Sequence, residues 1–266
     1  MKTEYVERAG GTLAYSDYGG SGELVLMFPG LGALRSEYRF LAPQLREAGY
    51  RAVSVDLRGH GDSSVPWEAY DVPSVGGDVL AMIEHLDAGA PHLIGTSFAG
   101  AAVVWAAAER PDRTRSLALI NPFARAANMS PVMNVLFWLM MHNPWRARTW
   151  VMYYRTLYPT NKPGDLEDYL ARLRENMAEP GRMGAASALA FSSRQPSDDR
   201  LERVTAPTLV MMGAKDPDFA DPAEEGTYIA EKTGGKLEMI DGAGHYPQTE
   251  MPEKTASILI EFLNQT

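Results

Sequence analysis

Cysteine is absent from the 266-residue chain. Its absence excludes disulfide bonds, a catalytic thiolate and cysteine-ligated zinc or iron–sulfur centres. Positive charge is also scarce, because 25 lysine and arginine residues stand against 34 aspartate and glutamate residues, for a formal net charge of −9. Sequence-independent binding to nucleic acid requires a basic surface that displaces counterions. We therefore expect no nucleic-acid partner.

Long apolar runs are missing as well. The longest, residues 135–141, is far shorter than the roughly 20 residues that a membrane-spanning helix requires. Residues 1–8 lack the apolar core of a signal peptide. The sequence therefore predicts a cytoplasmic protein without a membrane span, and it leaves the oligomeric state open between monomer and dimer.

Up to residue 120, short apolar segments alternate with helical patterns. This alternation is typical of crossover units and of a mostly parallel, open α/β sheet. A first hairpin turns at Gly10-Gly11. After it we predict strands at 24–28, 52–55, 92–94 and 116–120, and helices at 37–48, 74–86 and 98–109.

The alternation stops at Asn121-Pro122. Residues 121–200 show no convincing strand and are predicted to form several helices separated by prolines. Strand and helix then alternate again, with strands at 208–213 and 236–240 and helices at 222–233 and 252–263. We therefore predict an α/β core made of residues 1–120 and 201–266, with a helical insertion over 121–200.

The strongest local signal surrounds Ser97. The strand predicted at 92–94 leads into Gly95-Thr96-Ser97-Phe98-Ala99, and an alanine-rich helix begins at once. A turn this tight strains the backbone of the serine, so the positions two residues away must be small, as Gly95 and Ala99 are. The turn places Ser97 at the carboxyl edge of the sheet, where open α/β sheets bind ligands. We interpret Ser97 as a catalytic nucleophile, although the bare pattern also arises by chance.

A serine hydroxyl needs an adjacent base to act as a nucleophile at neutral pH. Of the five histidines, His245 is the favoured base, because it lies in a glycine-rich loop after the last predicted strand, at the same edge as Ser97. His60 also lies in a loop at that edge and is the weaker candidate. The remaining histidines fall in a helix, at the start of a strand and in the insertion, as His85, His92 and His142.

The base in turn needs a carboxylate that holds it in one tautomer and stabilises the imidazolium. Asp216 follows the strand predicted at 208–213 and is the favoured partner, while Asp218 and Asp221 remain alternatives. The chain order serine, aspartate, histidine is that of the α/β-hydrolase arrangement and differs from the trypsin and subtilisin orders.

Acyl transfer also requires N–H donors for the oxygen of the tetrahedral intermediate, the oxyanion hole. The backbone N–H of Phe98 lies at a helix N-terminus, where the dipole favours an anion. A second donor is expected from the loop Pro29-Gly30-Leu31-Gly32, and Leu31 is favoured because proline has no N–H. A plain strand-to-helix turn would use the same glycines, and this loop alone does not separate the two interpretations.

Together these motifs resemble the α/β-hydrolase superfamily, and the similarity covers the whole chain. Ser97, Asp216 and His245 fall in the strand-end loops that carry the family's triad. The resemblance implies a capped member of serine esterase type, in which residues 121–200 form the cap over the active site.

The resemblance extends to a second segment and has one exception. Residues 55–63 are similar to a structural segment of the family, which implies that Asp56 and His60 build a loop. Members usually carry a histidine where this chain has Pro29, a departure that bears on the local geometry of the oxyanion hole. The N–H of Leu31 is unaffected by it.

The triad and the resemblance imply a serine hydrolase that cleaves a carboxylic ester through an acyl-enzyme intermediate. Similar enzymes that carry aspartate in place of the serine, the epoxide hydrolases and haloalkane dehalogenases, are excluded by Ser97. No metal ion or organic cofactor is expected. Lactone opening, carbon–carbon bond hydrolysis, cyanohydrin cleavage and perhydrolysis use the same triad and remain open, as do a slow-turnover ligand sensor and a non-catalytic scaffold.

The insertion contains a dense group of methionine and aromatic residues. One interpretation is that they pack the cap on the core. The other is that flexible and flat side chains line a pocket for small to medium-sized hydrophobic esters. The second interpretation predicts that the substrate is bound by Phe28, Phe137, Trp138, Met141, Trp150 and Tyr154.

Overall fold

The computed structural model describes residues 2–266 apart from residues 88, 127–130 and 143. Eight strands form one sheet in the order β1-β2-β4-β3-β5-β6-β7-β8. The pairings of β1 with β2 and of β2 with β4 are antiparallel, and all others are parallel. The predicted α/β class with a mostly parallel open sheet is therefore confirmed. The strands span Glu4–Arg8 (β1), Gly11–Asp17 (β2), Leu24–Phe28 (β3), Arg51–Val55 (β4), His92–Thr96 (β5), Ser116–Ile120 (β6), Thr208–Gly213 (β7) and Lys236–Ile240 (β8).

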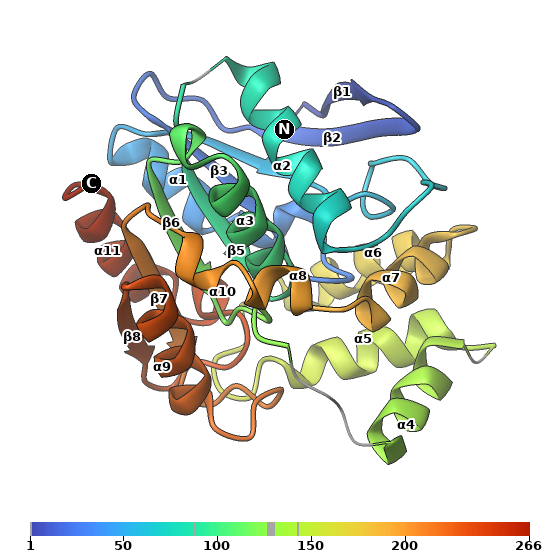
Figure 1. Ribbon diagram of the computed structural model, residues 1–266. Coiled ribbons are helices and arrows are strands. Elements are labelled where there is room, and N and C mark those ends of the chain that lie inside the picture. Colours follow the sequence, from blue (N-terminus) through green and yellow to red (C-terminus); the bar gives the residue numbers. More distant parts are fainter. Residues whose placement is uncertain (1, 88, 127–130, 143) are drawn as a thin grey trace.

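Helices cover both faces of this sheet (Figure 1). In β3, Leu24, Leu26 and Phe28 point into one apolar cluster, and Val25 and Met27 point into the cluster on the opposite face. This two-sided burial explains why the central strands are uninterrupted apolar runs rather than alternating ones. The first cluster is covered by α2 (Val72–Leu86), α3 (Phe98–Glu109) and α9 (Pro222–Thr233), and the second by α1 (Leu41–Glu47) and α11 (Pro252–Leu263).

The helix predicted at 37–48 is shorter than expected. Residues Arg35–Tyr38 form a separate 3₁₀ turn, and α1 begins only at Leu41. Pro43 accounts for the difference, because a proline lacks the N–H that a helix interior needs and is tolerated only in the first turn. A helix that began at residue 37 would place Pro43 beyond that turn.

Between β6 and β7 the described residues form helices and no strand. These helices are α4 (Pro131–His142), α5 (Arg146–Thr156), α6 (Leu166–Ala178), α7 (Arg182–Phe191) and α8 (Gln195–Asp198). Helices α4 to α7 share an apolar cluster with Ala33 and Tyr246, which belong to the loops after β3 and β8. The insertion therefore packs on loops at the carboxyl ends of the parallel strands. No helix in the described part of the chain is both long and apolar enough to cross a membrane.

A buried carboxylate ties the insertion to the core. Glu37 is fully buried, and one of its oxygens lies 2.7 Å from the hydroxyl of Tyr154 in α5. The hydroxyl of Tyr158 donates to the other oxygen at 3.2 Å. Thr249, in the short helix α10 (Pro247–Glu250), also donates its hydroxyl to Glu37. Because a buried charge is costly unless hydrogen bonds satisfy it, these donors favour one position of α5 on the core.

Candidate active site

Ser97 lies between the last residue of β5 and the first residue of α3. Its backbone has φ 55° and ψ −123°, a positive φ that a residue with a side chain rarely adopts. The turn leaves no room at Gly95, where an added Cβ would lie 2.5 Å from Val103 Cγ2 and 2.6 Å from the carbonyl oxygen of Ala99. The absence of a side chain at Gly95 is thus required by the tightness of the turn.

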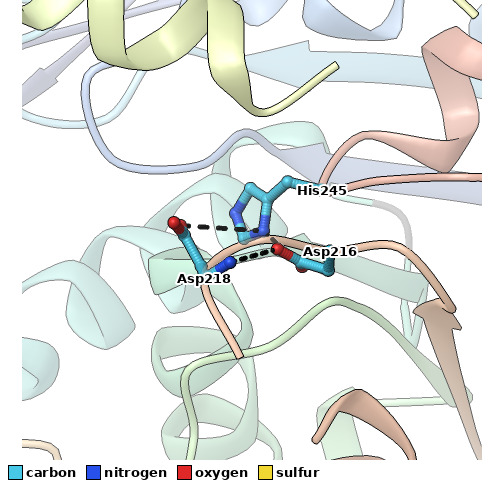
Figure 2. Close-up of side chains that lie close together, drawn as sticks. All are labelled: Asp216, Asp218 and His245. Atoms are coloured by element: carbon cyan, nitrogen blue, oxygen red, sulfur yellow. Dashed lines mark hydrogen bonds and ion pairs between the residues drawn. The ribbon is translucent and has the colours of Figure 1, made fainter. Parts of the chain in front are cut away.

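His245 and Asp216 come from neighbouring loops, after β8 and β7, and they meet in the interior (Figure 2). His245 Nδ1 lies 2.6 Å from Asp216 Oδ2, and both side chains are buried. Burial alone would lower the pKa of His245, but the charge of Asp216 and this hydrogen bond outweigh it and raise the pKa to about 9. The pair therefore stabilises the imidazolium, the form that a histidine adopts when it accepts a proton from serine.

The two alternative carboxylates have other partners. Asp218 Oδ2 is 4.0 Å from His245 Nδ1, and both its oxygens accept from the Tyr153 hydroxyl, at 2.7 and 2.8 Å. Its backbone N–H donates to Asp216 Oδ1 at 2.9 Å, which helps to orient that carboxylate (Figure 2). Asp221 caps α9 by accepting from two backbone N–H groups at its start. Of the three aspartates, only Asp216 lies within hydrogen-bond distance of His245.

Donor atoms of Asp216, Asp218 and His245 lie within 4.8 Å of one another, close enough to be considered as metal ligands. In this arrangement His245 Nδ1 and Asp216 Oδ2 are 2.6 Å apart. That separation is typical of a charge-assisted hydrogen bond with a proton between the atoms. The geometry is therefore that of a proton-sharing pair rather than of a cation site.

The loop after β3 lies directly against Ser97. A Cβ added to Gly30 would stand 3.0 Å from Ser97 Cβ and 3.5 Å from Ser97 Oγ. Leu31 is the next residue in this loop. Phe98 is the first residue of α3, and its N–H has no partner inside the helix. The places of Leu31 and Phe98 next to Ser97 are compatible with the predicted oxyanion hole. That their N–H groups bind the oxyanion stays a prediction.

Asn121 was not singled out from the sequence, although it bonds to the ends of the segments that carry Asp216 and His245. It is fully buried at the end of β6 with φ 42°, and its Nδ2 donates to the carbonyl oxygens of Gly244 and His245 at 3.1 and 2.9 Å. Its Oδ1 accepts from the N–H of Gly213 at 2.8 Å. The N–H of His245 donates to the carbonyl oxygen of Leu157 in the insertion, at 3.0 Å. The position of His245 thus depends on a neighbouring strand end and on the insertion.

Aromatic rings surround the histidine. Phe123 and Phe219 stack with their ring centroids 4.6 Å apart, and those centroids lie 5.9 and 6.4 Å from that of His245. Tyr246 meets the histidine ring edge-on, at 4.9 Å. These rings were not predicted from the sequence. Their position in the loops after β6, β7 and β8 is the sequence feature that could have indicated that they lie near His245. They give the histidine an apolar surrounding.

The residues predicted to bind substrate are spread over several environments. Trp150 is buried and donates its Nε1 hydrogen to the carbonyl oxygen of Gly32 at 3.1 Å, and Tyr154 donates to the buried Glu37. These two bonds favour the packing interpretation for both residues. Met141 is buried in the same apolar cluster.

The other three predicted residues differ from one another in exposure. Phe28 is buried at the end of β3, next to the loop that reaches Ser97. Phe137 is half-buried and contacts Tyr153 edge-on. Trp138 is 50% exposed and stacks on His142 instead of pointing inward. The structure thus does not gather the six into one lining, and their binding role stays a prediction.

His60 and Asp56 have positions apart from the triad. His60 is buried, its Nδ1 lies 2.9 Å from the carbonyl oxygen of Arg58, and burial lowers its pKa to about 4. Asp56 is buried and forms an ion pair with Arg35 while accepting from the N–H of Asp62 at 2.9 Å. Both residues thus bond within the loop after β4 or to Arg35, which agrees with the loop-building role that the resemblance implied.

A parallel sheet with a strained serine and an aspartate–histidine pair at its carboxyl edge defines a class of hydrolytic enzymes. The family model described as alpha/beta hydrolase fold matches residues 23–252. The chain therefore belongs to the α/β-hydrolase family, as the resemblance predicted, and is a hydrolase.

Curated relatives of known name are similar over most of the chain. A 3-oxoadipate enol-lactonase of Acinetobacter baylyi is 26% identical over 77% of this chain and 75% of its own length. A pimeloyl-[acyl-carrier protein] methyl ester esterase of Neisseria meningitidis is 28% identical over 90% of this chain and 93% of its own. An esterase structure from Exiguobacterium antarcticum, 23% identical, superposes with a TM-score of 0.85 over 96% of this chain and 97% of its own, a likeness of fold.

Proposed function

We propose that the protein is a serine esterase in which Ser97, His245 and Asp216 form a catalytic triad. The observation that carries the proposal is the buried pair of His245 and Asp216, 2.6 Å apart, at the sheet edge where Ser97 occupies its strained turn. The names of two relatives, an enol-lactonase and a methyl ester esterase, support cleavage of an acyl carbon–oxygen bond. No step in this chemistry requires a metal ion or an organic cofactor.

In the proposed reaction, Ser97 Oγ attacks the ester carbonyl carbon while His245 takes the hydroxyl proton. Only the neutral imidazole can accept it, and with a pKa of about 9 this form of His245 is the minor one at neutral pH and grows as the pH rises. The carbonyl oxygen becomes an oxyanion, and the N–H groups of Leu31 and Phe98 are proposed to bind it. The intermediate collapses to an acyl-enzyme as His245 gives the proton to the departing alcohol. A water molecule, deprotonated by His245, then releases the acid and restores Ser97. Asp216 keeps the imidazole oriented throughout.

We further propose that residues 121–200 act as a cap over this site, with 1–120 and 201–266 as the catalytic core. Contacts across the border support this division. Tyr153 of α5 bonds to Asp218, and the carbonyl of Leu157 accepts from the His245 N–H. The rings of Phe123 and Phe219 beside His245 suit a hydrophobic acyl or alcohol group of small to medium size.

Labelling with a fluorophosphonate tests the proposal, because the probe forms a covalent bond only with an activated serine. Intact mass and peptide mapping should place one adduct on Ser97. Ser97→Ala should abolish labelling and lower ester hydrolysis by about a million-fold, while Ser21→Ala, at an exposed serine ahead of β3, should change neither. A labelled residue other than Ser97, or hydrolysis retained in Ser97→Ala, would refute the triad.

A parallel assay with lactones and vinylogous diketones separates the ester reaction from the other reactions of the same triad.

A further inference from the structure

Arg194 lies at the border between the insertion and the core, in the short connection from α7 to α8. Its Nη1 donates to the carbonyl oxygens of Leu189 and Ser192, at 3.2 and 2.6 Å, and to the hydroxyl of Ser192 at 2.9 Å. All three acceptors are neutral, and they lie at the C-terminal end of α7, whose dipole favours a positive charge there. One side of the guanidinium is thus fixed by the end of a helix of the insertion.

The flat face of the same guanidinium covers Phe98. Its central carbon lies 4.4 Å from the centroid of the Phe98 ring, which is buried. Phe98 directly follows Ser97 and begins α3. Helix α8, which Arg194 precedes, packs against α3 (Figure 1). A positive charge is therefore held above the residue next to the nucleophile, at the end of the sheet where the insertion packs.

This charge has no counter-ion among the residues that the structure describes. Every ion pair there is made by other basic residues, and Arg194 Nε is buried without a hydrogen-bond partner within the described ranges. Burial lowers the pKa of Arg194 to about 10, so the group is still charged at neutral pH. Arg194 as a whole is half-buried. An uncompensated charge that is partly removed from water is costly, and such groups gather at functional sites.

The edge of the guanidinium formed by Nε and Nη2 carries no hydrogen bond within the described part of the chain, whereas Nη1 is used by the carbonyls of the insertion. Two parallel N–H groups on one edge match the two oxygens of a carboxylate. The ring of Phe98 fixes the plane of the fork. We infer that Arg194 binds a carboxylate at the far end of the acyl group, so that the enzyme acts on esters of dicarboxylic acids.

The inference rests on the proposed esterase function and narrows its substrate class. The acyl chain would run from the carbonyl carbon at Ser97, past the side chain of Phe98, to the carboxylate on Arg194. Because both ends are fixed, the length of the chain between them should have an optimum. An acyl group that ends in a methyl would occupy the same path and leave the guanidinium without a counter-ion.

Matched 4-nitrophenyl esters test the inference, because they share a leaving group and differ only at the end of the acyl chain. The neutral hexanoate is compared with the monoester of adipic acid, and monoesters from succinate to suberate test the length. The intact protein should prefer the adipate monoester in kcat/KM, with one optimum of length. In Arg194→Gln this preference should fall by about 10- to 100-fold, as expected when a hydrogen-bonded charge pair is lost, and Arg194→Lys should restore part of it.

Arg172→Gln is the matched control, since it removes a positive charge from an exposed position on α6 of the insertion. It should leave the ratio of the two kcat/KM values within the error of the intact protein. Equal losses on the neutral and the anionic ester in Arg194→Gln would assign Arg194 a structural role and overturn the inference. An unchanged ratio would overturn it as well.

A binding measurement separates this inference from the proposed reaction. Titration calorimetry with Ser97→Ala, which does not depend on turnover, should detect binding of monomethyl adipate and weaker binding of methyl hexanoate. Addition of Arg194→Gln to Ser97→Ala should weaken binding of the anion by about 10- to 100-fold. Absence of this loss refutes the carboxylate site even if the esterase is active. Conversely, a loss without any ester hydrolysis by the intact protein refutes the proposed reaction and keeps the site.

Discussion

The side-chain amide of Asn121 donates a hydrogen bond of 2.9 Å to the backbone carbonyl oxygen of His245. The same side chain accepts from the N–H of Gly213, three residues before Asp216 in the chain. One buried residue at the end of β6 therefore sets the spacing of the loops that carry the histidine and its carboxylate. Asparagine also tolerates the positive φ of 42° at this position better than most residues with a side chain.

Replacement of Asn121 should therefore harm both stability and turnover. Asn121→Ala leaves one N–H and two carbonyl groups without their partner in a buried place, and unsatisfied groups of this kind cost about 1–3 kcal/mol each. We expect the free energy of unfolding in urea to fall by about 2 kcal/mol or more and kcat/KM to fall with it. Asn161→Ala, at an exposed asparagine of the insertion, is the control. A variant with unchanged kcat/KM would show that the loops keep their spacing without Asn121.

The two aspartates near His245 should differ sharply on substitution. Asp216→Asn keeps the shape of the side chain but removes the charge that stabilises the imidazolium, and kcat should fall by about 10⁴-fold, as in other triads. Asp218→Asn should cost far less, because its oxygen is 4.0 Å from Nδ1 and its main partner is Tyr153. Steady-state assays of both variants on one aryl ester compare their kcat values. A larger loss of kcat in Asp218→Asn than in Asp216→Asn would assign the stabilisation of the imidazolium to Asp218.

Stability should depend on pH through His245. Its pKa in the folded protein, about 9, lies above the usual value of 6.5, so protonation favours the folded state. The resulting stabilisation is fully present below pH 6.5 and is lost as the pH rises through 9. The difference in free energy of unfolding between the intact protein and Asp216→Asn should therefore shrink over that interval. Urea titrations at pH 6, 7.5 and 9.5 measure it, and a difference that stays constant would mean that the pair is not charged in the folded state.

The turn at Ser97 could be predicted from the sequence because its causes are local. A buried strand, two small residues and an alanine-rich helix stand side by side in the chain, and the helix spans the predicted residues Phe98–Glu109. The positions of Asp216 and His245 followed from a similar rule, since parallel strands bring their carboxyl ends to one edge. The rule places a loop at that edge but does not orient its side chains.

The role of Asn121 could not be predicted, because its partners lie 92 to 124 positions away along the chain. Arg194 illustrates the same point, since only the fold places its charge on Phe98. The aromatic residues of the insertion show a different difficulty. Composition alone does not distinguish a side chain that packs, such as Trp150 on the carbonyl of Gly32, from one that lines a pocket. That distinction depends on long-range contacts.

Gly30 offers the most direct test of how closely the loop after β3 approaches Ser97. A Cβ there would lie 3.0 Å from Ser97 Cβ and 3.2 Å from the hydroxyl of Tyr246, closer than a methyl group normally packs. Gly30→Ala should displace the loop or the serine by a few tenths of an ångström, and a misplacement of 1 Å already costs about 100-fold in rate. We expect kcat/KM to fall at least tenfold, by this reasoning, while fluorophosphonate labelling slows in parallel.

Gly184 supplies the control for that substitution. It lies on an exposed face of α7, and an added Cβ meets no atom within 4 Å. Gly184→Ala should therefore keep full activity and stabilise the protein by roughly 0.5–1 kcal/mol, because alanine loses less backbone entropy than glycine in a helix. Thermal melts and ester kinetics of the two variants separate the close contact at Ser97 from a general effect of replacing glycine. If Gly30→Ala matched Gly184→Ala in rate, the loop would not be held against Ser97, and Leu31 would lose its support as the proposed oxyanion donor.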